Sequence, residues 1–345
     1  MEKNINTPLY EAVRASDAGE VIRLLKLGHD ANVRDNEGET PLHLACGRRI
    51  NLVIARALLE HGADANVRDD DGKTALVAIN LSLGPQVHDE IVSLLLAHGA
   101  DPNASSEGQT LMFRLARHDC VSAMSLLVDA GAAPDPKNGL KSTPLHFAAA
   151  KNKLENMRFL LACGADVNQP SLNGQTPLHM AVMTDGFFTA ESVDILINHG
   201  AKLEAQNKLR QTPLKTALSL ANAGAVFALI AHGASQEGCP QKVGRVSIAG
   251  MTARQAAVRG GLLERLKSLL EQPDGPDPAN SPKALSAYAK KHKKHDVTAL
   301  IQCHLAMRAI DGVLDEAAKN SHRPGPGAKS QLPTSASQNL NAVKP

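Results

Sequence analysis

The tetrapeptide Thr40-Pro41-Leu42-His43 recurs at Thr143–His146 and at Thr176–His179. The steps between the threonines of successive copies are 33, 34, 36, 33, 33, 36 and 40 residues once the degenerate copies are included. A nearly fixed period of this length predicts a stack of repeats, and not a domain with one central core. The degenerate copies begin at Thr7, Thr74, Thr110, Thr212 and Thr252.

A second marker, Gly-Ala-Asp-x-Asn, keeps the same period at residues 62–66, 99–103 and 164–168. A period near 33 and a Thr-Pro-Leu-His-x-Ala pattern are typical of ankyrin repeats, and the chain resembles this family over residues 4–305. The resemblance implies an all-α solenoid of about nine units, each a helix-turn-helix with a short β-hairpin finger. It also implies a concave binding surface made of fingertips and first helices.

Each repeat carries its own start and stop signals. In the unit from Asn32 to Asn66, Thr40 is a favoured N-cap and Pro41 suits the first helical position. The second helix carries apolar residues at helical spacing and ends before Gly62, the expected left-handed cap. Such a unit buries too little surface to fold alone, so its apolar stripe needs a neighbour on each side.

Some repeats depart in length from the regular spacing, and these departures locate insertions in the array. Extra residues between the two helices are expected at 81–88 and 184–190, and the finger at 234–251 is about seven residues too long. The last one or two units are degenerate, as expected for capping repeats. A short closing helix is expected over 306–320, and a disordered Pro/Gly/Ser-rich tail over 321–345.

Composition narrows the class of protein. No run of 18 apolar residues exists, which predicts no membrane span, and no apolar leader precedes the first repeat. The five cysteines are scattered and odd in number, which predicts reduced thiols and a cytoplasmic protein.

The 14 histidines follow the repeat and do not form a metal-ligand pattern. His43, His146 and His179 occupy the motif position, where the resemblance implies that the imidazole bonds local backbone. Another four, His61, His98, His199 and His232, precede cap glycines, where a partly cationic ring suits a helix C-terminus. We therefore expect no metal and no cofactor.

No catalytic signature stands out. Gly-x-Ser-x-Gly, phosphate-loop and His-Glu-x-x-His motifs are absent from the sequence. Cys120 follows His118-Asp119, but all three fall in a turn between helices, and a stack of repeats predicts no pocket to position them. The sequence thus predicts a non-enzymatic chain without a small-molecule substrate.

Two local features have two interpretations each. The run Lys290–His295 is either a solvated helix end or a patch for an acidic protein, nucleic acid or an import receptor, and the lack of interleaved aromatics argues against nucleic acid. Phe187 and Phe188 fall inside an insertion and either cover the helix ends or anchor a partner.

The expected function is non-catalytic recognition of a partner protein, as an adaptor or scaffold. Two alternatives stay open: a bacterial effector that is secreted into a host cell without a cleavable signal peptide and binds a host protein, and an enzyme of unrecognised activity. The candidate partner-binding residues are Asp35, Asn36, Arg68, Asp69, Asp70, Lys137, Asn138, Asn173, Lys208 and Arg210 on the fingers, with Phe187 and Phe188 on the opposite edge.

Overall fold

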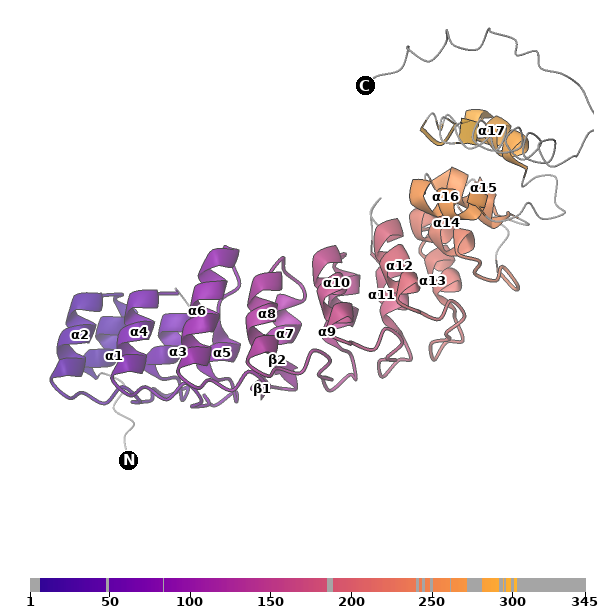
Figure 1. Ribbon diagram of the computed structural model, residues 1–345. Coiled ribbons are helices and arrows are strands. Elements are labelled where there is room, and N and C mark those ends of the chain that lie inside the picture. The colour runs from indigo at the N-terminus through magenta and orange to yellow at the C-terminus, as the bar shows by residue number, and fades with distance from the viewer. Residues whose placement is uncertain are drawn as a thin grey trace, which may run out of the picture.

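The computed structural model describes residues 7–47, 50–82, 84–184, 189–239, 242–243, 246–248, 251–260, 262–271, 281–291, 294, 296–298 and 301–302. Within these residues, pairs of antiparallel helices follow one another along the chain and lie side by side, with the connecting fingers along one edge (Figure 1). The predicted closing helix at 306–320 and the predicted disordered tail at 321–345 lie outside the described residues.

Up to residue 231, the first helices of successive repeats form one row of the stack and the second helices form another. The first helices are α1 (Pro8–Arg14), α3 (Pro41–Gly47), α5 (Ala75–Ala78), α7 (Leu111–Leu115), α9 (Pro144–Ala150), α11 (Pro177–Val182), α13 (Pro213–Ser219) and α15 (Ala253–Gly260). The second helices are α2 (Ala18–Lys26), α4 (Leu52–Glu60), α6 (Pro85–Ala97), α8 (Val121–Asp129), α10 (Leu154–Ala162), α12 (Thr189–Asn198), α14 (Ala223–Ala231) and α16 (Leu263–Glu271). Helix α17 (Pro282–Lys291) packs against α15, where the sequence predicts a ninth unit.

The core runs along the whole stack because each motif leucine points into the seam between repeats. These leucines are at most 1% exposed, and small alanines beside them let the helices approach closely. The motif leucines are Leu9, Leu42, Leu76, Leu145, Leu178 and Leu214. No helix in the described part of the chain combines the length and the apolar character needed to cross a bilayer.

The second helices from α2 to α14 end as predicted, at a glycine with φ between +78° and +92°. After α4 the chain closes with Ala63 N donating to the Leu58 carbonyl at 2.9 Å, a Schellman-type bond. A Cβ atom at Gly62 would meet no other atom within 4 Å, so backbone conformation and not lack of space selects glycine there.

The first insertion is not a loop throughout. Residues 85–88 form the first turn of α6, which begins at Pro85 and spans 13 residues, against 9 in α2, α4, α8, α10 and α14. Proline at the first helical position and Gly84 before it account for this early start. In the second insertion, residues 185–188 lie outside the described residues.

The fingers are mostly tight turns, and two contain short hairpins. Strands β1 (Ser105–Ser106) and β2 (Gln109–Thr110) pair antiparallel, with Ser105 opposite Thr110. The overlong finger at 234–251 uses its extra residues for a second hairpin, β3 (Lys242–Val243) with β4 (Val246–Ser247).

Helix α5 is shorter than the other first helices, and the next repeat compensates for it. The chain leaves the helix at Ile79, which is fully buried. The guanidinium of Arg114 on α7 donates to the carbonyl of Val77 and, at 2.7 Å, to that of Ile79. Two carbonyl groups that a longer helix would use are thereby satisfied. Burial lowers the pKa of Arg114.

Candidate protein-binding surface

Five of the described fingers are built around one short polar side chain that binds the turn from inside. Asp35 Oδ1 accepts hydrogen bonds from the backbone N–H groups of Glu37 at 2.9 Å and Glu39 at 2.8 Å. In a later finger, Asn138 Oδ1 accepts from the backbone N–H groups of Leu140 and Ser142, both at 3.0 Å. Such Asx turns fix the loop backbone without help from a partner.

Neighbouring fingers are also bonded to one another. Asp70 N donates to the Glu37 carbonyl at 3.0 Å, and Lys208 N donates to the Asn173 carbonyl at 2.9 Å. Gly38 lies against the next finger, since a Cβ there would be 2.4 Å from Asp70 Oδ1. The fingers thus form a continuous edge and not a set of independent loops.

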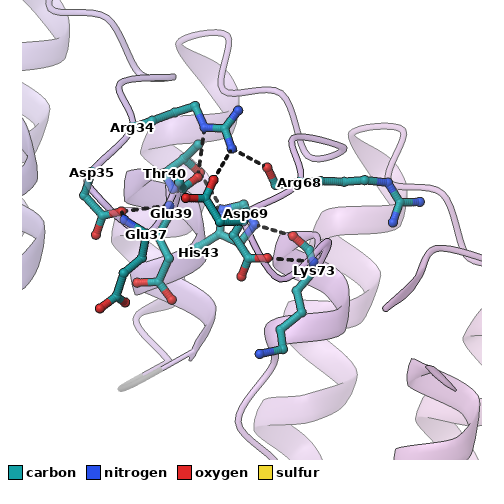
Figure 2. A network of polar contacts seen from close by, with 11 residues as sticks. Arg34, Asp35, Glu37, Glu39, Thr40, His43, Arg68, Asp69 and Lys73 are labelled. Atoms are coloured by element: carbon teal, nitrogen blue, oxygen red, sulfur yellow. Dashed lines mark hydrogen bonds and ion pairs between the residues drawn. The ribbon is translucent and has the colours of Figure 1, made fainter. Parts of the chain in front are cut away.

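Two arginines reinforce this edge, and Figure 2 shows the contacts of the first, Arg34. Arg34 donates to the carbonyls of Gly38 and Arg68 at 3.0 and 2.7 Å, and its guanidinium lies 3.5 Å from Asp70. Arg68 donates to the carbonyls of Gly72 at 2.8 Å and Ser105 at 2.7 Å. The exposed Arg68 side chain therefore supports two fingers.

The asparagine of the Gly-Ala-Asp-x-Asn marker joins each repeat to the next. Asn66 Nδ2 donates to the Gly99 carbonyl at 2.8 Å, and Asn66 Oδ1 accepts from Asp101 N at 2.7 Å. The same pair of bonds links Asn168 to Gly200 and Lys202. A carboxamide supplies both the donor and the acceptor that these positions need, which explains the residue type.

The motif histidines bind backbone, as the resemblance implied. His146 Nδ1 accepts from Thr143 N at 3.1 Å, and Nε2, 3.0 Å from the Gln175 carbonyl, must carry the proton. His43 and His179 make the equivalent bonds to the carbonyls of Lys73 and Gln211. Burial lowers the pKa of all three imidazoles, more than the carbonyl contacts raise it, which favours the neutral ring.

Most of the predicted partner-binding residues reach solvent at the fingers, but not all do. Asp35 and Asp69 are half-buried in their turns, and Asn138 is only 8% exposed because its side chain holds the turn together. Phe187 and Phe188 lie outside the described residues. The exposed residues are Asn36, Arg68, Asp70, Lys137, Asn173, Lys208 and Arg210.

Two shallow hollows lie between the fingers and the first helices of the early repeats. One, of about 410 Å³, is lined by Tyr10 and Leu44 on the helices and by Asp35 and Glu37 on a finger. The other, of about 500 Å³, is lined by finger residues of the next two repeats and by Arg114. Residues four positions after the motif threonine, such as Leu44 and Arg114, therefore face the finger side.

Three carboxylates at the first finger have oxygens within 4.8 Å of one another: Asp35, Glu37 and Glu39. Asp35 accepts hydrogen bonds from the Tyr10 hydroxyl and from two backbone N–H groups, so the turn itself brings these groups together.

Cys120 has a different neighbour from the one that the sequence suggested. Its Sγ atom lies 3.6 Å from Nδ1 of His88, which comes from the lengthened α6 and is 1% exposed. Burial raises the pKa of the Cys120 thiol, and the negative charges of Asp89 and Asp119 raise it further by a smaller amount. A raised thiol pKa disfavours the thiolate, which is the nucleophilic form of cysteine. Cys46, Cys120, Cys163 and Cys239 are free thiols, and Cys303 lies outside the described residues.

A family model described as three copies of the ankyrin repeat matches residues 9–106 and 85–171, and one of a single ankyrin repeat matches residues 173–208. The chain belongs to the ankyrin-repeat family. Two solved ankyrin-repeat domains are similar to it, each with a TM-score of 0.54. That of Bcl-3 is 28% identical and covers 65% of this chain and 98% of its own. That of human ASB11 is 24% identical and covers 68% of this chain and 100% of its own, and this likeness concerns the fold alone.

Among curated proteins, the mouse (Mus musculus) B-cell lymphoma 3 protein homolog is 30% identical over 227 residues, which is 64% of this ankyrin-repeat chain and 49% of that protein. The human (Homo sapiens) neurogenic locus notch homolog protein 4 is 36% identical over 126 residues, which is 36% of this chain and 6% of that protein. The matched region thus spans half or less of each of these relatives.

Proposed function

We propose that this ankyrin-repeat chain binds a partner protein without catalysis, on the concave surface formed by its fingers and first helices. The observation that carries the proposal is the way the fingers are built. Side-chain bonds fix most of the turns, backbone bonds join neighbouring turns, and charged side chains extend from them into solvent. A rigid surface of this kind loses little conformational entropy on binding, which favours recognition.

The absence of catalysis is part of the same proposal. The Cys–His pair that came closest to a reactive group holds a thiol whose pKa is raised by burial. The motif histidines have both ring nitrogens engaged with the backbone of their own repeat and the next. These observations favour structural roles for the residue types that most often carry out acid–base or nucleophilic chemistry.

The test starts with affinity capture on the intact chain, followed by titration of the captured protein against two variants. One changes three exposed finger residues in different repeats: Asn36→Ala, Lys137→Ala and Arg210→Ala. The matched control changes three exposed residues of second helices: Lys26→Ala, Arg56→Ala and Glu60→Ala. We expect the finger variant to weaken binding and the control to leave it unchanged. A loss of binding in the control alone would overturn the proposal.

A further inference from the structure

A row of exposed leucines lies on three consecutive fingers of the second half of the array. Leu140 is 61% exposed, Leu172 is 44% exposed and Leu209 is 76% exposed. Single exposed leucines are ordinary on protein surfaces, but these three occupy nearly the same place in successive repeats. Leu140 and Leu209 stand three residues before the motif threonine, and Leu172 stands four before it.

The three fingers that carry these leucines are in contact. Leu172 N donates to the Leu140 carbonyl at 2.7 Å, and Lys208 N, next to Leu209, donates to the Asn173 carbonyl at 2.9 Å. Gly174 keeps this contact close, since a Cβ there would be 3.1 Å from Asn207 Cα. The leucines therefore lie on one continuous edge, and a single ligand can reach all three.

The first helices behind these fingers add apolar surface. Phe147 and Met180 stand four residues after their motif threonines, the position that faces the finger side in earlier repeats, and both are half-buried. Met183 at the end of α11 is 42% exposed, and its sulfur lies 3.5 Å from Nε2 of Gln175 on a finger. Arg117 lies over the Phe147 ring at 4.1 Å.

Cations surround the leucines. Lys137, Lys141, Lys208 and Arg210 are all exposed on the same fingers, and none of them forms an ion pair among the described residues. Their charges are therefore available to a ligand.

The first three fingers have the opposite character. The residues three before the motif threonine are Glu37, Asp71 and Glu107, all exposed carboxylates. The cations nearby are engaged within the protein, with Arg34 close to Asp70 and Lys73 2.7 Å from Asp71. The change from carboxylates to leucines at nearly the same place in successive repeats separates the finger edge into an acidic half and an apolar, basic half.

We propose that the apolar, basic half binds an acidic protein segment that carries leucine-like side chains, with the partner's apolar residues on Leu140, Leu172 and Leu209 and its carboxylates at Lys208 and Arg210. This inference rests on the proposed function and names the chemistry of the partner. The acidic half repels the same segment and so fixes its position along the array, because like charges across an interface oppose binding. The apolar contacts supply affinity, and the charges supply orientation and rate of association.

The probe is a display library of random peptides about twelve residues long, selected against the intact chain, with the enriched peptide then titrated by fluorescence polarisation. We expect enriched peptides to combine net negative charge with leucine or phenylalanine.

Three sets of variants then locate the binding site. The variant Leu140→Ser, Leu172→Ser, Leu209→Ser should weaken binding of the enriched peptide by about tenfold or more. Lys208→Gln with Arg210→Gln should weaken peptide binding less than the triple-serine variant does, and should make the affinity depend less on salt concentration. Leu27→Ser with Val53→Ser, at exposed apolar positions at the C-cap of α2 and in α4, should change affinity less than about twofold.

Several results would overturn the inference. No enrichment, neutral peptides, or an acidic peptide that binds the triple-serine variant as tightly as the parent would each do so. An oligonucleotide of equal charge that binds parent and triple-serine variant alike would assign the cations to phosphate. Enrichment of basic peptides, with binding that is lost in the variant Glu37→Gln, Asp71→Asn, would overturn the inference and leave the proposed function standing. Peptides insensitive to every finger change would contradict both. Thermal melts of each variant separate lost binding from lost folding.

Discussion

Single histidines and glycines show which structural requirement each position of the repeat motif meets. His146 is buried between two repeats, and it donates to a carbonyl of the following repeat while accepting from its own N-cap threonine. Protonation of Nδ1 abolishes the bond from the threonine, because a protonated ring nitrogen cannot accept, whereas the Nε2–H group still donates to the carbonyl. The motif histidine is therefore both an N-cap partner and a link between repeats.

Stability should fall on mild acidification because burial lowers the pKa of His43, His146 and His179 in the folded chain. In the unfolded chain these rings take up protons near pH 6.5, so the stabilisation is complete above that pH and is lost as pH falls toward the lower folded pKa. Each ring adds up to about 1.4 kcal/mol per pH unit to the slope. Urea denaturation between about pH 7.5 and pH 5 measures it, and His146→Gln should make the slope shallower. An unchanged slope in that variant would refute the assignment.

Two glycines with similar backbones should respond differently to alanine. Gly62 has φ +86° and open space around it, whereas Gly38 has φ +75° and a Cβ added there would lie 2.4 Å from Asp70 Oδ1. Gly62→Ala should cost only the left-handed strain, about 1–2 kcal/mol, while Gly38→Ala should cost more because the next finger must move. Chemical denaturation of the pair gives the difference. Equal losses would mean that the fingers are not packed as rigidly as described above.

At the scale of elements, irregular repeats are stabilised by long cationic side chains that bind buried carbonyl groups. Helix α5 ends after four residues, and Arg114 from the next repeat binds the carbonyls of Val77 and Ile79. In a degenerate repeat, Arg254 occupies the motif leucine position, and its guanidinium binds the Leu269 carbonyl at 2.8 Å. A repeat can thus lose its motif residues and keep its place in the stack when a long cationic side chain satisfies buried carbonyls.

Replacement of Arg114 by methionine should destabilise the chain by about 1–3 kcal/mol, because two carbonyl groups of buried residues lose their donor while the apolar stem is retained. Arg56→Met, at an exposed position of α4, is the matched control and should change stability by less than about 0.5 kcal/mol. Thermal and urea unfolding of both variants give the comparison. A loss no larger than that of the control would show that the guanidinium bonds contribute nothing.

Regular features of the repeats were predictable from the sequence because each depends on a few local residues. The Thr-Pro start, the glycine stop and the period between them gave the helix pairs, the seam of motif leucines and the degenerate unit after Thr252. Long-range compensation was not predictable in the same way. Nothing near Arg114 in the sequence indicates that it binds carbonyls 35 to 37 positions away.

The candidate binding surface was likewise predictable only where it depends on local sequence. Exposure of Asn36, Lys208 and Arg210 follows from their place in a turn, but the burial of Asn138 depends on which polar residue holds each turn together. The structural role of Arg68 depends on the carbonyl of Ser105 in the next finger. The leucine row was detectable, since comparison of the residues before each motif threonine shows it, but an exposed leucine is distinguished from a core one only by the fold.

At the scale of the whole molecule, the array has a direction. Its early fingers are acidic and its later fingers are apolar and basic, although the chain as a whole carries a formal charge of only +2. A near-neutral total therefore hides a separation of charge along one edge. A partner that follows the edge meets both halves in order, which gives a long repeat surface a preferred orientation for its ligand.

The most direct test of the central claim, that the finger edge is the recognition surface, is hydrogen–deuterium exchange on the intact chain with and without the protein recovered by affinity capture. We predict slower exchange in the fingers and first helices, strongest in the fingers that carry Leu140, Leu172 and Leu209, and unchanged exchange in the second helices. Protection confined to the second helices, with the fingers unaffected, would contradict the account.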